Sequence, residues 1–335
     1  MDWEHNVSLQ PYNSLGLPAR ARFFHQATKE VELLDDLRKV IKDKLELLVI
    51  GGGSNLVLAR DIDGLALKVD LKGIEIVEEN EKSATLRVAA GEPWPELVKH
   101  CLKRGFFGLE NLSDIPGTAG AAPIQNIGAY GAELSQRLLS VSVIEQTTGS
   151  RQEIPAADCR FSYRQSRFKG LWRDRYLITA ITLKLTKQPQ LCLDHAGIQE
   201  AMPTHPGPED VAREVCRLRR LKLPDPKLLG NAGSFFTNPV IEARQAKDML
   251  AEHANLRMYD LGDGRVKLAA GWLVEQCGLK GIRRGSVGVH KEQALVLVHH
   301  GGGTGRQLLD LAEEIRTTVQ ARFGVKLEIE PRVVA

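Results

Sequence analysis

The sequence lacks several features that would assign it to other classes of protein. Its 335 residues include only 5 cysteines, widely scattered and without a CxxC pair, which is typical of reduced cytosolic thiols rather than of disulfides or a zinc site. No apolar run is long enough to span a bilayer, and residues 1–6 lack the pattern of a signal peptide. We therefore expect a cytoplasmic protein with no membrane insertion and no metal.

An excess of charge of one sign is missing as well. Lysine and arginine together number 45 against 42 aspartates and glutamates, a net charge of +3. Binding to a nucleic-acid backbone usually needs a larger basic excess, so we expect no nucleic-acid partner, although a local basic pocket for a phosphorylated ligand stays open. The hydrophobic share of 43% is ordinary for a globular protein, and the length indicates two or three domains.

The chain alternates between helical and strand patterns. Val31, Leu34, Leu37 and Ile41 stand at helical spacing and predict a helix over residues 29–42 with that face buried. Further helices are predicted at residues 95–103, from 208 onward, at 241–253 and at 304–323. Strands are predicted at residues 45–50, 65–69, 74–77, 86–89, 141–145, 176–185, 294–298 and 325–334. The prolines of residues 189–208 predict a long loop, and those of residues 222–226 a domain boundary.

Two glycine-rich segments are candidates for ligand binding. The first, Gly51-Gly52-Gly53-Ser54-Asn55, follows a predicted strand, and its N–H groups could hold a phosphate, although a plain tight turn explains it equally well. It is no Rossmann fingerprint, because Leu56 stands where the third glycine belongs. The second, residues 115–131, holds too many small residues to fill a core alone, which favours a ligand cradle over a flexible linker.

Three other patterns admit a chemical or an ordinary interpretation. Arg164 lies among aromatic and hydroxyl residues and could hold a carboxylate, or could stand on an exposed strand edge. Ser234 lies in the glycine-flanked segment 230–239 and could present its hydroxyl, or could cap a helix. Glu328 and Glu330 alternate on a predicted strand whose face could simply be solvated. Neighbouring histidines at 299 and 300 would point to opposite faces of a strand, which argues against a metal pair.

Taken together and in this order, six segments resemble the UDP-N-acetylenolpyruvoylglucosamine reductase family, over essentially the whole chain from Tyr12. They are residues 115–131, 163–166, 222–226, 230–239, 267–273 and 327–332. The resemblance implies an α+β fold with two FAD-binding subdomains of the vanillyl-alcohol-oxidase/PCMH type and a C-terminal α+β substrate-binding domain. The first subdomain would be residues 1–70 joined by the last strand at 325–335, the second residues 71–222, and the substrate-binding domain residues 223–324.

The same resemblance implies a reaction of peptidoglycan synthesis. NADPH would reduce bound FAD, and UDP-N-acetylglucosamine enolpyruvate would then be reduced to UDP-N-acetylmuramate. By position, Arg164 matches the residue that stabilises developing charge, Ser234 the proton donor and Glu330 its partner acid. The matching FAD contacts are Gly51, Gly52, Gly53, Ser54, Asn55, Leu56, Ile115, Pro116, Gly117, Thr118, Ala119, Gly120, Gln125, Asn126, Gly128, Ala129, Tyr130, Gly131, Ile178 and Arg332. The matching substrate contacts are Tyr163, Arg219, Lys222, Asn238, Tyr259 and Gln293.

One departure concerns the substrate loop. The longer branch of the family, which this chain resembles, closes that loop with a tyrosine, but no tyrosine lies in residues 189–208. His195 falls at or near the position and is a candidate substitute in contact with the substrate diphosphate, or an exposed loop histidine. Two other functions stay open from the residues: an FAD oxidase of the same fold, and an inactive flavin- or nucleotide-sugar-binding protein. We expect a monomer whose partners are NADPH and the UDP-sugar.

Overall fold

The chain forms two compact units, each with a hydrophobic core of its own. The structure is a computed structural model and describes residues 2–335. Unit 1 comprises residues 2–7, 21–53 and 62–221, and unit 2 comprises residues 8–20, 54–61 and 222–335. No helix among the described residues has both the length and the apolar character needed to cross a membrane. The division into three domains stays a prediction.

Unit 1 begins with a four-stranded sheet and one helix. The strand order is β1 (Glu4–Ser8), β2 (Arg20–Ala27), β5 (Ile62–Val69) and β3 (Glu46–Ile50), and β2, β5 and β3 run parallel. Helix α1 (Glu30–Asp43) connects β2 to β3. Because β5 is the central strand of the parallel trio, its side chains are almost all buried, which explains the apolar run seen in the sequence.

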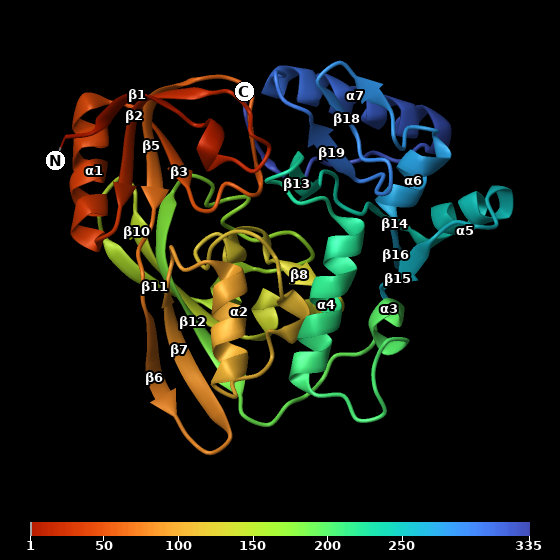
Figure 1. Cartoon of the computed structure of the whole chain (residues 1–335), viewed down its shortest axis with the longest axis horizontal. Helices are drawn as coiled ribbons and strands as arrows, with labels where there is room; N and C mark the ends of the chain where they lie inside the picture. The colour runs from red at the N-terminus through yellow and green to blue at the C-terminus, as the bar shows by residue number, and fades with distance from the viewer. Residues whose placement is uncertain (1) are drawn as a thin grey trace. The chain divides into compact units, whose positions relative to one another are not determined.

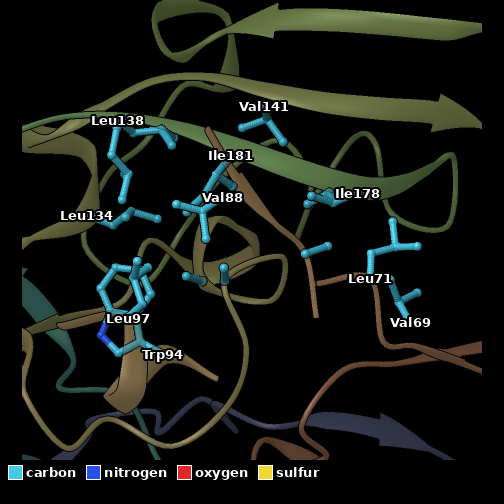
Figure 2. Packing of buried hydrophobic residues seen from close by; sticks show 14 of the residues in the cluster. Val69, Leu71, Val88, Trp94, Leu97, Leu134, Leu138, Val141, Ile178 and Ile181 are labelled. Atoms are coloured by element: carbon cyan, nitrogen blue, oxygen red, sulfur yellow. The ribbon is translucent and has the colours of Figure 1, made fainter. Parts of the chain in front are cut away.

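The second sheet of unit 1 is antiparallel. Its order is β11 (Arg151–Pro155), β10 (Leu138–Glu145), β12 (Tyr176–Thr186), β7 (Ser83–Ala89) and β6 (Ile74–Glu79). Helix α2 (Trp94–Lys103) packs against the side chains of this sheet (Figure 1). Figure 2 shows Val88 and Ile181 of the sheet in one cluster with Trp94 and Leu97 of the helix. Residues 115–131, which follow α2 in the chain, pack against this core through Ala119, Ala122 and Ile127.

That segment has almost no regular structure. It contains one 3-10 turn (Ala122–Gln125) and the short strand β8 (Gly128–Ala129), which pairs with β9 (Ala132–Glu133). The excursion at residues 189–208 leaves β12 and returns to helix α4 (Pro208–Lys222), and it contains the short helix α3 (Ala196–Gln199). Ile198 of the excursion packs with Val211 and Val215 of α4, so the excursion lies against that helix (Figure 1).

Unit 2 has two antiparallel sheets, a parallel pair and three helices. The first sheet has the order β13 (Gly230–Ser234), β19 (Val296–His299), β18 (Val287–Val289) and β17 (Arg283–Arg284). The second has the order β14 (Val240–Glu242), β16 (Arg265–Leu268) and β15 (Met258–Asp260), and β20 (Arg332–Val334) pairs in parallel with β4 (Leu56–Leu58). The helices are α5 (Ala243–Glu252), α6 (Ala270–Gln276) and α7 (Gly305–Phe323).

The ends of α7 show why this helix was readily predicted. The Thr304 hydroxyl accepts a hydrogen bond from the Gln307 N–H over 3.3 Å, and the Gln307 side chain accepts one from the Thr304 N–H over 3.0 Å. This reciprocal capping box satisfies two N–H groups that the helix itself cannot. Gly324 closes the other end with a φ of 64°, a left-handed conformation that glycine adopts without strain.

Four predictions about local structure are wrong in part. In α1 the predicted apolar face is only partly correct, because Leu37 is buried as predicted, whereas Val31 and Ile41 are exposed and Leu33 and Val40 are buried instead. The excursion is not entirely a loop, since it contains α3.

The other two errors concern unit 2. Ser234 does not cap a helix, because residues 230–234 of the glycine-flanked segment form strand β13. The predicted strand at 325–334 is regular only over Arg332–Val334, because residues 325–331 form no ladder beyond a single bridge from Ile329 to Phe236. Val325 and Leu327 are buried because they pack into the core of unit 2, and that packing produced the alternating pattern.

Candidate functional site

The two glycine-rich segments pack against each other in unit 1. A Cβ atom added to Gly51 would lie 2.7 Å from the Thr118 hydroxyl oxygen, and one added to Gly52 would lie 2.8 Å from the Gly117 Cα atom. Only glycine therefore allows the two backbones to approach this closely. The turn after β3 and the start of residues 115–131 form one continuous backbone surface, as the FAD-binding prediction requires.

Residues 117–120 are held in place by the polypeptide behind them. The Gly117 carbonyl accepts a hydrogen bond from the Trp94 N–H over 3.0 Å. The Ala119 N–H donates to Glu92 and the Gly120 N–H donates to Ala90, each over 2.9 Å. Because these bonds fix the backbone before any ligand arrives, the segment is preorganised, which lowers the entropic cost of binding.

The middle of the segment depends on Asn126, which is fully buried with a φ of 47°. Its amide nitrogen donates to the Glu133 carboxylate over 2.7 Å and to the Ser162 carbonyl over 3.2 Å. Its amide oxygen accepts from the Ser135 N–H over 3.0 Å. Asn126 therefore stabilises the left-handed turn and connects the segment to the residues that precede Arg164.

Arg164 lies directly beside the segment. Its Nη2 atom donates a hydrogen bond to the Gly128 carbonyl over 2.7 Å, and its guanidinium lies 5.2 Å from the centre of the Tyr163 ring. The backbone of Arg164 is left-handed, with a φ of 53°. Such a conformation costs energy for a non-glycine residue, and strained residues of this kind cluster at functional sites.

A second arginine of unit 1 lies near this one. Arg219 of α4 donates through Nε to the Asp114 carbonyl over 3.1 Å. Burial lowers the pKa of its guanidinium, and the like charge of Arg164 acts in the same direction. Burial raises the pKa of the neighbouring Tyr130 hydroxyl, while Arg219 opposes that shift. The two arginines therefore give this part of unit 1 a concentration of positive charge, which favours an anionic ligand.

An unsatisfied polar atom also points to a ligand. The Ser113 hydroxyl is buried and has no hydrogen-bond partner within residues 2–335. Ser113 lies two residues before Ile115, which itself is partly buried against the core. Buried polar atoms normally have a partner, so a ligand or a water molecule is expected at this position. Together with the glycine contacts, this atom makes the residues of unit 1 fit a bound FAD.

The remaining predicted FAD contacts of unit 1 have ordinary surroundings. Ile178 of β12 is 7% exposed and lies in the core cluster of Figure 2. Pro116 and Gly131 are exposed, whereas Gln125 and Ala129 are partly buried.

In unit 2, Ser234 and Glu330 are brought to neighbouring positions. Ser234 ends β13, where it pairs with Val296. The segment before β20 runs antiparallel to the residues after Ser234, because the Glu330 N–H donates to the Phe235 carbonyl over 2.9 Å and Phe236 pairs with Ile329. Phe235 and Phe236 are fully buried, so the backbone next to Ser234 and the backbone of Glu330 that pairs with it are held by the core of unit 2. The backbone therefore places Ser234 and Glu330 on adjacent segments of unit 2.

The predicted contacts at the start of β4 and β20 are also close in unit 2. The Arg332 N–H donates to the Asn55 carbonyl over 3.0 Å, and Arg332 pairs with Leu56 in the parallel ladder. Ser54 precedes them and is partly buried. These residues, 275 or more positions apart in the chain, therefore share one edge of unit 2.

The predicted substrate contacts of unit 2 fall into three places. The Asn238 side chain accepts a hydrogen bond from the Ala270 N–H over 3.0 Å, and the Gln293 side-chain oxygen would lie 3.8 Å from a Cβ added to Gly271. Both amides therefore lie at the start of α6. Tyr259 is 55% exposed on β15, with the Lys267 ammonium 5.6 Å from its ring centre. Lys222 is the exposed last residue of α4.

His195 contacts the second glycine-rich segment, residues 115–131, through Tyr130. Its ring lies 4.9 Å from the Tyr130 ring in an edge-to-face arrangement. The structure does not make it an exposed loop residue, because it is partly buried.

Two residues next to the site have no counterpart among the predictions. Asn111 and Ser113 stand in the polar stretch 110–114 before Ile115, in which only Leu112 is apolar, and both are buried. A polar stretch immediately upstream of a glycine-rich segment was the available signal, and it does not single out these two residues.

Comparisons with known proteins decide the family. Residues 225–334 match the family described as UDP-N-acetylenolpyruvoylglucosamine reductase, C-terminal domain, and residues 21–154 match the FAD binding domain. A UDP-N-acetylenolpyruvoylglucosamine reductase of Chromobacterium violaceum is 46% identical over 339 residues, covering 100% of this chain and 99% of the relative. One of Pseudomonas aeruginosa is 46% identical, covering 99% of both chains. The chain belongs to the UDP-N-acetylenolpyruvoylglucosamine reductase family.

Solved structures agree with this assignment at the level of the fold. The crystal structure of UDP-N-acetylenolpyruvylglucosamine reductase from Thermus caldophilus has a TM-score of 0.71 at 23% identity and covers 100% of both chains. p-Cresol methylhydroxylase has a TM-score of 0.52 at 11% identity, covering 97% of this chain and 84% of its own. The predicted reductase family, its FAD-binding domain and the PCMH-type α+β fold are therefore confirmed.

Proposed function

We propose that this member of the UDP-N-acetylenolpyruvoylglucosamine reductase family catalyses the NADPH-dependent reduction of UDP-N-acetylglucosamine enolpyruvate to UDP-N-acetylmuramate. The proposal is supported by the backbone hydrogen bond from Glu330 to Phe235, the residue after Ser234, within a chain that matches its relatives from end to end. Bound FAD would supply the chemistry of hydride transfer, accepting it from NADPH and passing it to the sugar.

The residues of unit 1 would hold the cofactor and meet negative charge. The backbone of Gly51–Gly53 and Gly117–Gly120 would receive the FAD, because it leaves no room for side chains between the two segments. Hydride addition to the terminal carbon of the enol ether places carbanion character beside the substrate carboxylate. Arg164 would stabilise that charge as it develops, and Arg219 would hold an anionic group of the UDP-sugar.

The residues of unit 2 would supply the proton and bind the nucleotide sugar. Ser234 would donate its hydroxyl proton to the carbon beside the carboxylate, and Glu330 would hold the serine in position and return the proton. A serine hydroxyl is a weak acid, but an enolate-like intermediate is a strong base, so placement matters more than acidity. Lys222, Asn238, Tyr259 and Gln293 would contact the UDP-sugar, as would Tyr163 and His195 of unit 1.

A single experiment tests this function against its alternatives. The purified protein should show a flavin absorbance band that NADPH bleaches under anaerobic conditions, and the enolpyruvyl sugar should restore it with formation of UDP-N-acetylmuramate. A band restored only by oxygen would indicate an oxidase. A colourless protein would indicate that the chain does not retain FAD.

A further inference from the structure

The side-chain amide of Asn111 attaches the 189–208 excursion to the second glycine-rich segment, residues 115–131. The Nδ2 atom of Asn111 donates a hydrogen bond to the Tyr130 carbonyl over 2.8 Å and a second to the Cys192 carbonyl over 2.9 Å. Asn111 is only 4% exposed, so water cannot readily replace either bond. A residue of the 3-10 turn Glu110–Leu112 thus joins two segments that lie 62 positions apart in the chain.

A close approach beside Asn111 reinforces the attachment. The Cys192 thiol donates to the same Tyr130 carbonyl over 3.8 Å. A Cβ atom added to Gly131 would lie 2.8 Å from the Cys192 sulfur, and Gly131 has a φ of 88°. The excursion can therefore reach the Tyr130 carbonyl only because glycine follows the tyrosine.

The side chain of Tyr130 extends the contact toward the cationic part of the site. Its ring meets His195 edge to face at 4.9 Å and packs with Ile198 in the small core beneath the excursion. Its hydroxyl interacts electrostatically with Arg219. The position of the excursion relative to Arg219 thus depends on the Tyr130 backbone that Asn111 holds.

We propose that Asn111 is a positioning residue that fixes the excursion against Tyr130 and thereby sets the affinity for the UDP-sugar. Asn111 acts through the Tyr130 and Cys192 carbonyls rather than by touching substrate. The inference rests on the proposed function for the identity of the ligand. The attachment itself does not, because the two hydrogen bonds belong to the protein alone.

The test combines hydrogen exchange with kinetics of the flavin-containing enzyme. The N–H groups of Ile198, Gln199 and Ala201 all bond to carbonyls within the excursion, so their exchange rates report its local stability. In Asn111→Ala these amides should exchange about tenfold faster, as expected for the loss of buried hydrogen bonds. The KM for the enolpyruvyl sugar should rise by about the same factor, whereas bleaching by NADPH should keep its rate.

Two further variants separate attachment from packing. Asn111→Asp keeps the side-chain shape but loses both donors, so it should reproduce the effect of alanine. Gly131→Ala should loosen the same amides from the other side of the contact, and it serves if the Asn111 variants do not fold. Asn13→Ala is the matched control, because Asn13 is a buried amide of unit 2 whose side-chain nitrogen likewise donates to two carbonyls, those of Leu9 over 2.8 Å and Leu17 over 3.1 Å, and not to the excursion.

The outcomes decide the proposal. Faster exchange with a higher KM for the sugar in Asn111→Ala and Asn111→Asp, but no faster exchange of the excursion in Asn13→Ala, supports it. Unchanged exchange in the Asn111 variants overturns it, and so does faster exchange with an unchanged KM. A wild-type protein that cannot reduce the sugar overturns the proposed function instead, and the exchange rates then still show whether Asn111 holds the excursion.

Discussion

Ser234 and Glu330 come from distant parts of the sequence and are placed by the backbone beneath them. The hydrogen bond from the Glu330 N–H to the Phe235 carbonyl fixes their separation, and two buried phenylalanines anchor it. Under the proposed function, this geometry would matter in only one half of the reaction. Oxidation of NADPH needs no acid at the sugar, whereas reduction of the enolpyruvyl group needs a proton at the carbon beside the carboxylate.

We therefore expect Ser234→Ala to retain FAD and to be bleached by NADPH at nearly the wild-type rate. Return of the flavin band after mixing with the enolpyruvyl sugar should slow by about 10²–10⁴-fold, the usual contribution of a positioned general acid. Ser234→Cys should recover part of the loss, since a thiol can also donate a proton. Stopped-flow absorbance measures both phases. Equal slowing of the two phases in Ser234→Ala would show that the serine is structural and would make Glu330 the next candidate donor.

Arg164 allows a second prediction at the scale of one residue. Its fork donates to the Gly128 carbonyl, and its charge would act on the carboxylate only as reduction proceeds. Arg164→Lys keeps a positive charge but loses the planar fork, so kcat should fall more than the affinity for the UDP-sugar. Steady-state kinetics with the enolpyruvyl sugar measures both. A variant that loses mainly affinity would identify Arg164 as a ground-state clamp for the carboxylate.

Single residues also show where sequence reasoning stopped. Arg164, Ser234 and Glu330 were predicted because they match motifs of a family, and nothing in their spacing alone distinguishes them from a strand edge, a cap and a solvated strand. Asn111 was not found, because its importance lies in bonds to two backbone carbonyls that only the fold brings within 2.8 and 2.9 Å. Every residue has a backbone carbonyl, so no pattern of residue types can predict which carbonyls Asn111 will bond to.

At the scale of elements, α1 shows that a helix can be predicted correctly while its buried face is not. The helix was predicted nearly to its ends, but two apolar stripes compete in its sequence. Leu33, Leu37 and Val40 face the core, while Val31 is 55% and Ile41 48% exposed. Periodicity identifies a helix, but the sheet beneath it selects the stripe.

The two stripes can be compared on the same helix. Leu33→Ala removes a fully buried side chain and should lower the free energy of unfolding by about 2–5 kcal/mol. Val31→Ala removes an exposed side chain and should change it by no more than about 0.5 kcal/mol. Denaturant unfolding of both variants, analysed at constant m, measures the difference. Equal losses of unfolding free energy in the two variants would show that Val31 is buried, as the sequence predicted.

The contact between the two glycine-rich segments gives another prediction at this scale. In Gly52→Ala the new methyl group would meet the Gly117 backbone at 2.8 Å, so the two segments must separate. Overpacking typically costs about 1–3 kcal/mol, which corresponds to a loss of about 5- to 150-fold in FAD affinity. Titration of the apoprotein with FAD, followed by flavin fluorescence, measures it.

The matched control is Gly170→Ala, at an exposed glycine whose added Cβ would make only an ordinary contact of 3.6 Å with the Ser166 carbonyl oxygen. Its affinity for FAD should equal that of the wild type. A Gly52→Ala protein that binds FAD as tightly as this control would show that the close approach serves packing alone.

At the scale of the whole molecule, the two units explain which features of the fold were accessible from sequence. A change of pattern after residues 222–226 indicated a boundary, and unit 2 does begin its long segment at Lys222. Residues 8–20 and 54–61 belong to unit 2 as well, although they lie early in the chain. Their membership follows from long-range bonds such as that from the Ser14 hydroxyl to the Asn231 carbonyl at 2.7 Å, which local patterns do not encode.

Removal of FAD should lower the thermal stability of the protein, and the size of the effect should depend on the contact between the two glycine-rich segments of unit 1. A ligand that binds only the native state adds RT ln(1 + [L]/Kd), about 2.7 kcal/mol at a hundredfold excess over Kd. Most of the predicted contacts lie in unit 1, where the Ser113 hydroxyl has no protein partner within the described chain and the glycine surface is already fixed. Saturating FAD should therefore raise the Tm of the apoprotein by about 4–8 °C. Differential scanning calorimetry measures the shift, with Gly52→Ala and Gly170→Ala run alongside. Since stabilisation follows affinity, the shift should shrink in the first variant and persist in the second, and an equal shift in all three proteins would place the FAD away from the contact between the two glycine-rich segments.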